Sequence, residues 1–116
     1  MKIDLHSHTT CSDGALSPVE LVQRAQQMQV DVLAITDHDT VSAIQIAAQY
    51  IQSSNTKLTL ISGVELSTSW HGFDIHIVGL QVNKDDSQFL QRLESQLAER
   101  DRRAVRICDK LEKCGY

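Results

Sequence analysis

The residues most able to do chemistry in this sequence are histidines and carboxylates that recur through its first two thirds. His6 and His8 are separated by one residue, and side chains at positions i and i+2 of an extended segment point to the same side. Two imidazoles placed in this way can chelate one metal ion, although a pair of surface histidines explains the spacing equally well. Asp13 follows in Ser12-Asp13-Gly14, where an aspartate before glycine is also an ordinary turn signal.

A fourth candidate, His38, lies in Ile35-Thr36-Asp37-His38-Asp39-Thr40, just after the predicted strand 32–36. Charged residues at this point indicate a site, because the sites of parallel α/β folds collect at the carboxyl ends of strands. A plainer interpretation is that Asp39 or Thr40 caps the next helix, and the two interpretations are compatible.

Two further candidates interrupt apolar runs. Glu65 lies within Leu60–Leu66, where a carboxylate is costly to bury unless it is paired or bound to a metal. His76 lies between Ile75 and Ile77, where a lone histidine is more often a satisfied core residue. The recurrence of such positions in one chain favours a site.

Mixed imidazole and carboxylate ligands suit manganese, iron or zinc. The candidates His6, His8, Asp13, His38, Glu65 and His76 outnumber the ligands of a single zinc ion, which points to a cluster of two or three ions. Such clusters specialise in in-line attack on phosphorus, in which a metal-bound hydroxide is the nucleophile and no catalytic side chain is needed.

The predicted elements alternate between strands and helices, which indicates an α/β fold with parallel pairing. Ser17, Pro18 and Glu20 form a helix-start signal, in which Glu20 completes a capping box. The expected strands are 2–5, 32–36, 58–61 running on into 63–66, and 73–80, and the expected helices are 17–29, 40–53 and 85–113.

Composition limits the class of protein. The 116 residues suffice for one small domain or part of a larger one. A net charge of −4 gives no general attraction to nucleic acid or anionic lipid, so we expect no sequence-specific DNA binding and no membrane association. The three cysteines match no zinc or disulfide pattern, and the N-terminus has no signal-peptide pattern. We therefore expect a cytoplasmic protein.

Five motifs together resemble the PHP (polymerase and histidinol phosphatase) family. They are Asp4-Leu5-His6-Ser7-His8-Thr9-Thr10, Ser12-Asp13-Gly14, Ile35-Thr36-Asp37-His38-Asp39-Thr40, Gly63-Val64-Glu65 and Ile75-His76-Ile77-Val78-Gly79. The resemblance implies the N-terminal part of a distorted (β/α)7 TIM-like barrel with three divalent ions, most often Mn²⁺ and sometimes Fe or Zn. By this resemblance His6 and His8 hold the first ion, Asp13 and His38 the second, Glu65 bridges the first and third, and His76 binds the third.

Within that family the chain is most similar to the branch of 3′,5′-nucleoside bisphosphate phosphatases that also act as 5′-to-3′ exoribonucleases. This implies nucleotides or short RNA as substrates. Arg100 falls in the apolar stripe of the predicted helix 85–113, and Arg103 lies three residues on. Guanidinium groups match phosphate oxygens, so we expect Arg100 and Arg103 to bind substrate, whereas Arg102 and Arg106 read as a solvated basic surface.

The family completes its site with a later histidine and an Asp-x-His pair, and no histidine follows His76. We expect residues 1–84 to be a barrel segment with the metal ligands and residues 85–116 to begin an inserted, substrate-contacting part. We also expect the chain to be truncated and inactive by itself. The alternative function is a non-catalytic metal- or nucleotide-binding module.

Overall fold

The computed structural model describes residues 1–115, and its strands and helices follow one another in the predicted order. It divides into two compact units, Met1–Lys84 and the segment from Asp85 onward. The second unit consists of the long helix α3 (Ser87–Lys113), whose N-cap Asp86 accepts the N–H of Phe89 at 2.9 Å. None of the helices in residues 1–115 combines the length and apolar character that crossing a membrane requires.

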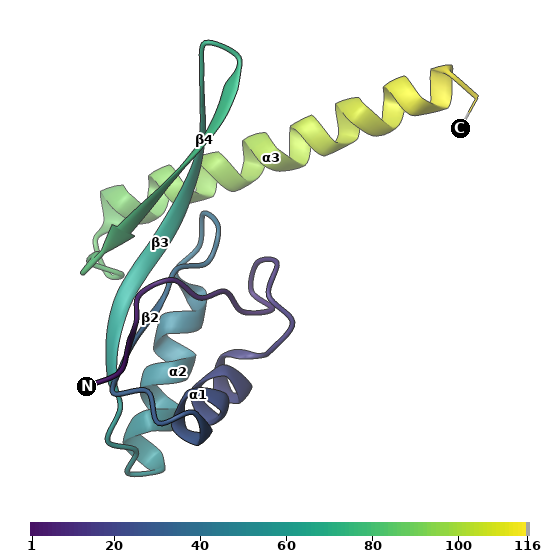
Figure 1. Cartoon of the computed structure of the whole chain (residues 1–116). Helices are drawn as coiled ribbons and strands as arrows, with labels where there is room; N and C mark the ends of the chain where they lie inside the picture. Colours follow the sequence, from purple (N-terminus) through teal and green to yellow (C-terminus); the bar gives the residue numbers. More distant parts are fainter. Residues whose placement is uncertain (116) are drawn as a thin grey trace. The chain divides into compact units, whose positions relative to one another are not determined.

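A four-stranded sheet organises the first unit, with the strands in the order β1-β2-β3-β4 (Figure 1). β1 pairs in parallel with β2 and β2 with β3, whereas β4 runs antiparallel to β3. The parallel pairing predicted from strand–helix alternation is thus confirmed for the first three strands. Their bounds are β1 (Ile3–Asp4), β2 (Val32–Ile35), β3 (Thr59–Trp70) and β4 (Phe73–Leu80).

β3 is longer than predicted, since it runs unbroken from Thr59 to Trp70. Figure 1 shows it as one curved strand that begins beside β2 and ends in a hairpin with β4. The hairpin turns through His71 and Gly72, which have φ values of 50° and 82°. Positive φ at both central residues is typical of a two-residue hairpin turn, and glycine adopts it without strain. His71 is exposed in this turn.

α1 (Pro18–Gln27) starts as the sequence predicts. The Ser17 hydroxyl accepts the N–H of Glu20 at 3.2 Å, and the Glu20 carboxylate accepts the N–H of Ser17 at 3.1 Å. The backbone and side-chain hydrogen bonds with Ser17 lower the pKa of Glu20.

α2 (Ser42–Ser53) begins two residues later than predicted, with Val41 at its N-cap. The expectation that Asp39 or Thr40 caps this helix is therefore wrong. The Thr40 hydroxyl does accept the N–H of Ser42 at 3.3 Å, but Asp39 is fully buried with a φ of 54°. Asp39 belongs instead to the connection between β2 and α2, where it serves the site described below.

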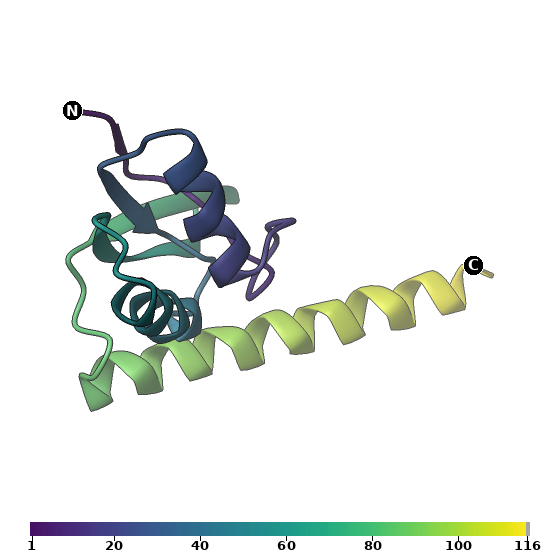
Figure 2. The same ribbon diagram turned by 90° about the horizontal axis from the view of Figure 1, so that it is seen from below.

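α1 and α2 pack against each other, and α2 packs against β3 (Figure 2). Right-handed crossovers between consecutive parallel strands place both helices on one face of the sheet. Apolar side chains from the helices and from the central strands fill the space between them. The most buried apolar residues of the unit are Val22, Leu33, Ala34, Ile35, Ala43, Ile44, Ala47 and Val64.

Candidate metal centre

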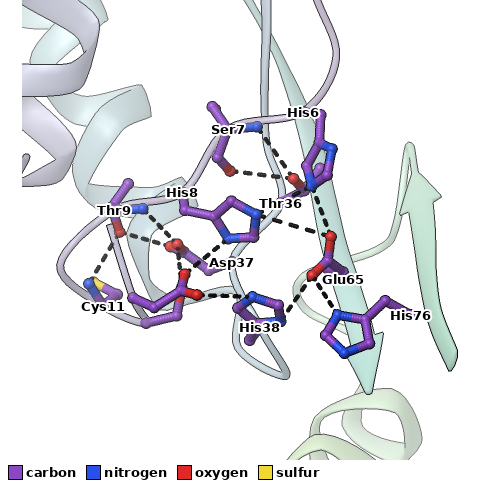
Figure 3. Close-up of polar contacts among 12 residues, drawn as sticks. His6, Ser7, His8, Thr9, Cys11, Thr36, Asp37, His38, Glu65 and His76 are labelled. Carbon is purple, nitrogen blue, oxygen red and sulfur yellow. Dashed lines mark hydrogen bonds and ion pairs between the residues drawn. The ribbon is translucent and has the colours of Figure 1, made fainter. Parts of the chain in front are cut away.

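The segment after β1 presents His6 and His8 together because Ser7 is held on the opposite side. The Ser7 hydroxyl donates to the carbonyl of Ala34 at 2.6 Å, and the Ser7 N–H donates to Thr36 Oγ1 at 3.2 Å. The backbone N–H of Thr36 returns a bond to the Ser7 carbonyl at 2.8 Å. Pairing with the β2 segment thus continues past the end of β1, and the alternation of an extended chain turns both imidazoles to the same side (Figure 3).

Asp13 is carried by a tight loop, Thr9 to Gly14. The carbonyl of Thr9 accepts the N–H of Ser12 at 3.0 Å and that of Gly14 at 2.8 Å. A Cβ at Gly14 would stand 2.4 Å from the carbonyl oxygen of His8, so only glycine allows the chain to close this tightly. The loop brings the Asp13 carboxylate to 3.3 Å from His8 Nδ1.

His38 reaches the centre because the chain after β2 stays bound to β3. The N–H of Glu65 donates to the carbonyl of Asp37 at 3.0 Å, and the N–H of Asp39 donates to the carbonyl of Glu65 at 3.0 Å. The Asp39 carboxylate also accepts the N–H of Ser67 at 3.2 Å. His38 therefore lies directly beside Glu65 as an isolated parallel bridge.

His76 meets Glu65 across the hairpin. In the antiparallel register His76 is opposite Ser67, two residues from Glu65 along β3. Such diagonal neighbours lie on one face of a sheet within reach of long side chains. His76 Nδ1 is 3.0 Å from Glu65 Oε2.

The two oxygens of Glu65 face different partners, as Figure 3 shows. Oε1 is 2.7 Å from His6 Nε2 and 3.9 Å from His8 Nε2. Oε2 is 2.9 Å from His38 Nδ1 and 3.0 Å from His76 Nδ1. Glu65 therefore stands between two groups of candidate ligands, with one carboxylate oxygen toward each.

All six predicted ligands thus converge, and they form three overlapping groups that could each hold an ion. The groups are His6, His8 and Glu65; His8, Asp13 and His38; and His38, Glu65 and His76. Within each group the candidate ligand atoms lie within 4.8 Å of one another. Metal–ligand bonds of about 2.1 Å separate neighbouring ligand atoms by roughly 3.0–3.4 Å. The pairs His6 Nε2–His8 Nε2 and His38 Nε2–Asp13 Oδ2, each 3.1 Å apart, have this spacing.

Two buried nitrogens give a further test of this fit. Among residues 1–115, the buried side-chain nitrogen and oxygen atoms without a hydrogen-bond partner are His8 Nδ1 and His38 Nδ1. Each nevertheless faces a carboxylate oxygen, at 3.3 Å and 2.9 Å respectively. A lone pair facing a carboxylate is repulsive, so each Nδ1 carries a proton toward its carboxylate, which leaves the Nε2 lone pair of His8 and of His38 for a cation. Neutral imidazole nitrogens together with carboxylate oxygens are a donor set that fits divalent cations.

The electrostatics of Glu65 follow from these contacts. Burial on its own would raise the pKa of the carboxyl, but the hydrogen bond with His76, the charge of His38, the hydrogen bond with His6 and the charge of His8 outweigh it. The pKa of Glu65 is therefore lowered, and the carboxylate is ionised when a cation approaches.

The centre is closed on one side and open on the other. The side chains of Glu65 and His38 are 6% and 10% exposed, whereas those of Asp13, His6 and His76 are 64%, 56% and 50% exposed. A ligand can thus approach from solvent on the side of the exposed groups.

Arg100 and Arg103, the predicted substrate-binding residues, are exposed on α3 in the second unit. Their neighbours pair with acidic groups, since Glu99 accepts contacts from Arg102 at 3.4 Å and from Arg106 at 3.0 Å. This agrees with the solvated basic surface predicted for Arg102 and Arg106.

The residues that hold the candidate ligands in place could not be recognised from the sequence. Ser7, Thr9 and Asp37 lie within the quoted motifs, but their spacing predicts no role for them. Their signal was faint, because a buried serine, threonine or aspartate is visible only through its partners.

The comparisons with known proteins identify the family. The PHP domain profile matches residues 4–113, and the chain belongs to the PHP family. It is 52% identical to a 5′-3′ exoribonuclease of Haemophilus influenzae over 98% of this chain and 41% of the relative. It is 36% identical to a 3′,5′-nucleoside bisphosphate phosphatase of Chromobacterium violaceum over 97% of this chain and 39% of the relative.

A solved structure gives the same result for the fold. An amidohydrolase of Chromobacterium violaceum, with bound sulfate and no metal, superposes with a TM-score of 0.87 at 35% identity. The match covers all of this chain and 40% of that one. The chain thus spans about two fifths of the length of the proteins it matches, and its fold is part of a PHP barrel, as predicted.

Proposed function

We propose that the protein hydrolyses phosphate esters of nucleotides, with 3′,5′-nucleoside bisphosphates and the 5′ ends of short RNA as substrates. The observation that carries the proposal is the division of the Glu65 carboxylate between His6 and His8 on one oxygen and His38 and His76 on the other. Relatives that share the PHP family are named for these two activities.

The overlapping groups resolve into three ion sites when each histidine uses one nitrogen. A neutral imidazole offers one lone pair and keeps one N–H. If His8 binds through Nε2, its Nδ1–H faces Asp13; if His38 binds through Nε2, its Nδ1–H faces Glu65. A second interaction of this kind orients a histidine ligand.

The resulting assignment agrees with the family resemblance. His6, His8 and Glu65 would hold one ion, Asp13 and His38 a second, and Glu65 with His76 a third. We propose Mn²⁺ as the metal, with Fe or Zn as alternatives for this donor set. When bound, such ions act as Lewis acids and lower the pKa of water so that it attacks at neutral pH.

The chain's own residues position the substrate. The exposed side chains of His6, Asp13 and His76 mark the open side, on which a phosphate can approach. Arg100 and Arg103 would bind a second phosphate, because a guanidinium matches phosphate oxygens in a bidentate geometry. This second contact favours bisphosphates and polynucleotides over simple monoesters.

Hydrolysis by the whole protein tests the proposal. Metal-free protein is reconstituted with Mn²⁺ and given a 3′,5′-nucleoside bisphosphate, a 5′-phosphorylated oligoribonucleotide and an aryl phosphate. We expect release of phosphate from the first and of mononucleotides, from the 5′ end, from the second. Manganese binding without turnover of any of the three would favour the non-catalytic alternative.

A further inference from the structure

The Asp13 carboxylate is set in place by its loop and not by packing. Its side chain is 64% exposed, so neighbouring side chains do little to confine it. Both of its oxygens nevertheless lie close to imidazole nitrogens of the centre, at 3.3 Å from His8 Nδ1 and 3.1 Å from His38 Nε2. The backbone of the loop must therefore determine the position of the Asp13 carboxylate.

That loop is organised around Thr9, which is fully buried. Its carbonyl accepts the N–H groups of Ser12 and Gly14, the two neighbours of Asp13. Its hydroxyl oxygen accepts the N–H of Cys11 at 3.1 Å. Whatever fixes Thr9 consequently fixes the residues on both sides of Asp13.

Thr9 is in turn held by Asp37. Asp37 Oδ1 accepts the N–H of Thr9 at 2.6 Å and Oδ2 accepts its hydroxyl at 2.6 Å. Oδ1 also accepts the hydroxyl of Ser12 at 2.7 Å. Asp37 is 1% exposed, so water cannot replace these partners when one of them is lost.

Asp37 is not itself a candidate ligand. It belongs to none of the three groups that could hold an ion among residues 1–115, and both of its oxygens are engaged by the loop. Its carbonyl binds the N–H of Glu65. One residue thus joins the loop of Asp13 to the strand of Glu65, the two carboxylates of the centre.

We propose that Asp37 is a positioning residue, which fixes the Thr9–Gly14 loop and thereby sets where the Asp13 carboxylate meets a metal ion. The proposal rests on the metal site described under the proposed function. It assigns a role to a side chain that touches neither metal nor substrate.

The test compares Asp37→Ala and Asp37→Asn in the whole protein by titration with Mn²⁺. Asp37→Ala leaves two buried donors of Thr9 unpaired, and we expect it to weaken one class of manganese site by about 10- to 100-fold, the usual effect of losing a partner outside the ligand shell. Asp37→Asn keeps an acceptor for Thr9 and Ser12, so we expect partial rescue. The matched control is Asp31→Asn, which replaces a carboxylate by an amide at the other end of β2. We expect its manganese affinity to equal that of the wild-type protein.

A double-mutant cycle separates positioning from general stability. Once Asp13→Asn has removed the ligand, adding Asp37→Ala should cause no further loss of manganese affinity. Equal losses with and without Asp13, or unchanged affinity in Asp37→Ala, would overturn the proposal.

Hydrogen exchange in the metal-free protein makes the test independent of the proposed function. We expect Asp37→Ala to speed exchange of the Thr9, Ser12 and Gly14 amides while Asp31→Asn leaves them protected. If the wild-type protein binds no manganese, the proposed function fails. Unaltered loop exchange in Asp37→Ala would overturn the role of Asp37 itself.

Discussion

The two ends of β2 make the same kind of hydrogen bond, from a backbone N–H to an aspartate, in different surroundings. At the amino end Asp31 accepts the backbone N–H of Lys2 at 2.7 Å, and at the carboxyl end Asp37 accepts that of Thr9 at 2.6 Å. Both aspartates tie the amino-terminal segment to the β2 segment. The first is exposed, whereas the second is buried with several other polar groups.

The difference shows what burial does to a polar contact. Around Asp31 water can replace any lost partner, and the contact only anchors the start of the chain. Around Asp37, Thr9, Thr36 and Asp39 are all fully or almost fully buried, and an unpartnered group would cost about 1–3 kcal/mol. The carboxyl end is therefore held in one arrangement, and a centre of converging ligands requires such an arrangement.

The largest effect should come from removing metal, which acts at only one of these ends. We expect a chelator to abolish hydrolysis by the whole protein and Mn²⁺ to restore it. Hydrogen exchange should rise in residues 7–14 and 37–39 and stay constant in residues 29–32, because the candidate ligands lie at the carboxyl end. Undiminished hydrolysis in excess chelator would contradict the metal mechanism.

Next in size is Glu65→Gln, which keeps the shape of the side chain and removes the charge shared between two ion groups. We expect kcat/KM to fall by more than about 100-fold, since outer-shell partners alone are worth 10- to 100-fold. Metal content measured by elemental analysis should fall in parallel.

The matched control for this change is Glu20→Gln, which makes the same substitution in the capping box of α1. Glutamine also completes such a box, so activity and metal content should be unchanged. A comparable loss in both variants would mean that Glu65 acts through stability and not through metal binding.

The convergence of these candidate ligands could be predicted from the sequence, because several of them are polar residues in otherwise apolar segments. Glu65 and His76 stand out in apolar strands, and His6 and His8 share a face by simple alternation. The capping box at Ser17 was equally visible, since all of its partners are local.

The parts that could not be predicted depend on distant partners. Asp39 stands just before α2, where an aspartate commonly caps a helix. Its actual bond, from the Ser67 N–H on β3, joins residues far apart in the sequence and could not be predicted. The role of Asp37 could not be predicted either, since it depends on hydrogen bonds from Thr9 and Ser12, which are distant in the sequence. The length of β3 was missed because its second half is defined by pairing with β4.

Arg100→Ala should have a smaller effect, limited to substrates with two phosphates. It tests whether substrate specificity depends on α3, which lies outside the two ends of β2. We expect kcat/KM for a 3′,5′-bisphosphate to fall by about 10- to 100-fold, the value of one charge-assisted hydrogen bond. Hydrolysis of an aryl phosphate should change little, because it offers no second phosphate. Arg106→Ala, which removes a partner of Glu99, is the control and should affect neither substrate. Equal losses on both substrates would give Arg100 a structural role.

The smallest effect should come from Asp31→Ala, the counterpart of Asp37→Ala at the amino end of β2. The substitution removes the 2.7 Å bond to the Lys2 N–H, but Lys2 is exposed and its amide then binds water. The Lys2 ammonium also keeps its 2.9 Å bond to the carbonyl of Met28, so the amino-terminal segment stays anchored. We expect the free energy of unfolding to fall by less than about 1 kcal/mol, with manganese affinity and kcat/KM unchanged. Denaturant titration and manganese titration of the same preparation check both statements. A loss of metal affinity in Asp31→Ala would show that the two ends of β2 are coupled through the strand, and the contrast between an anchoring end and a binding end would then be wrong.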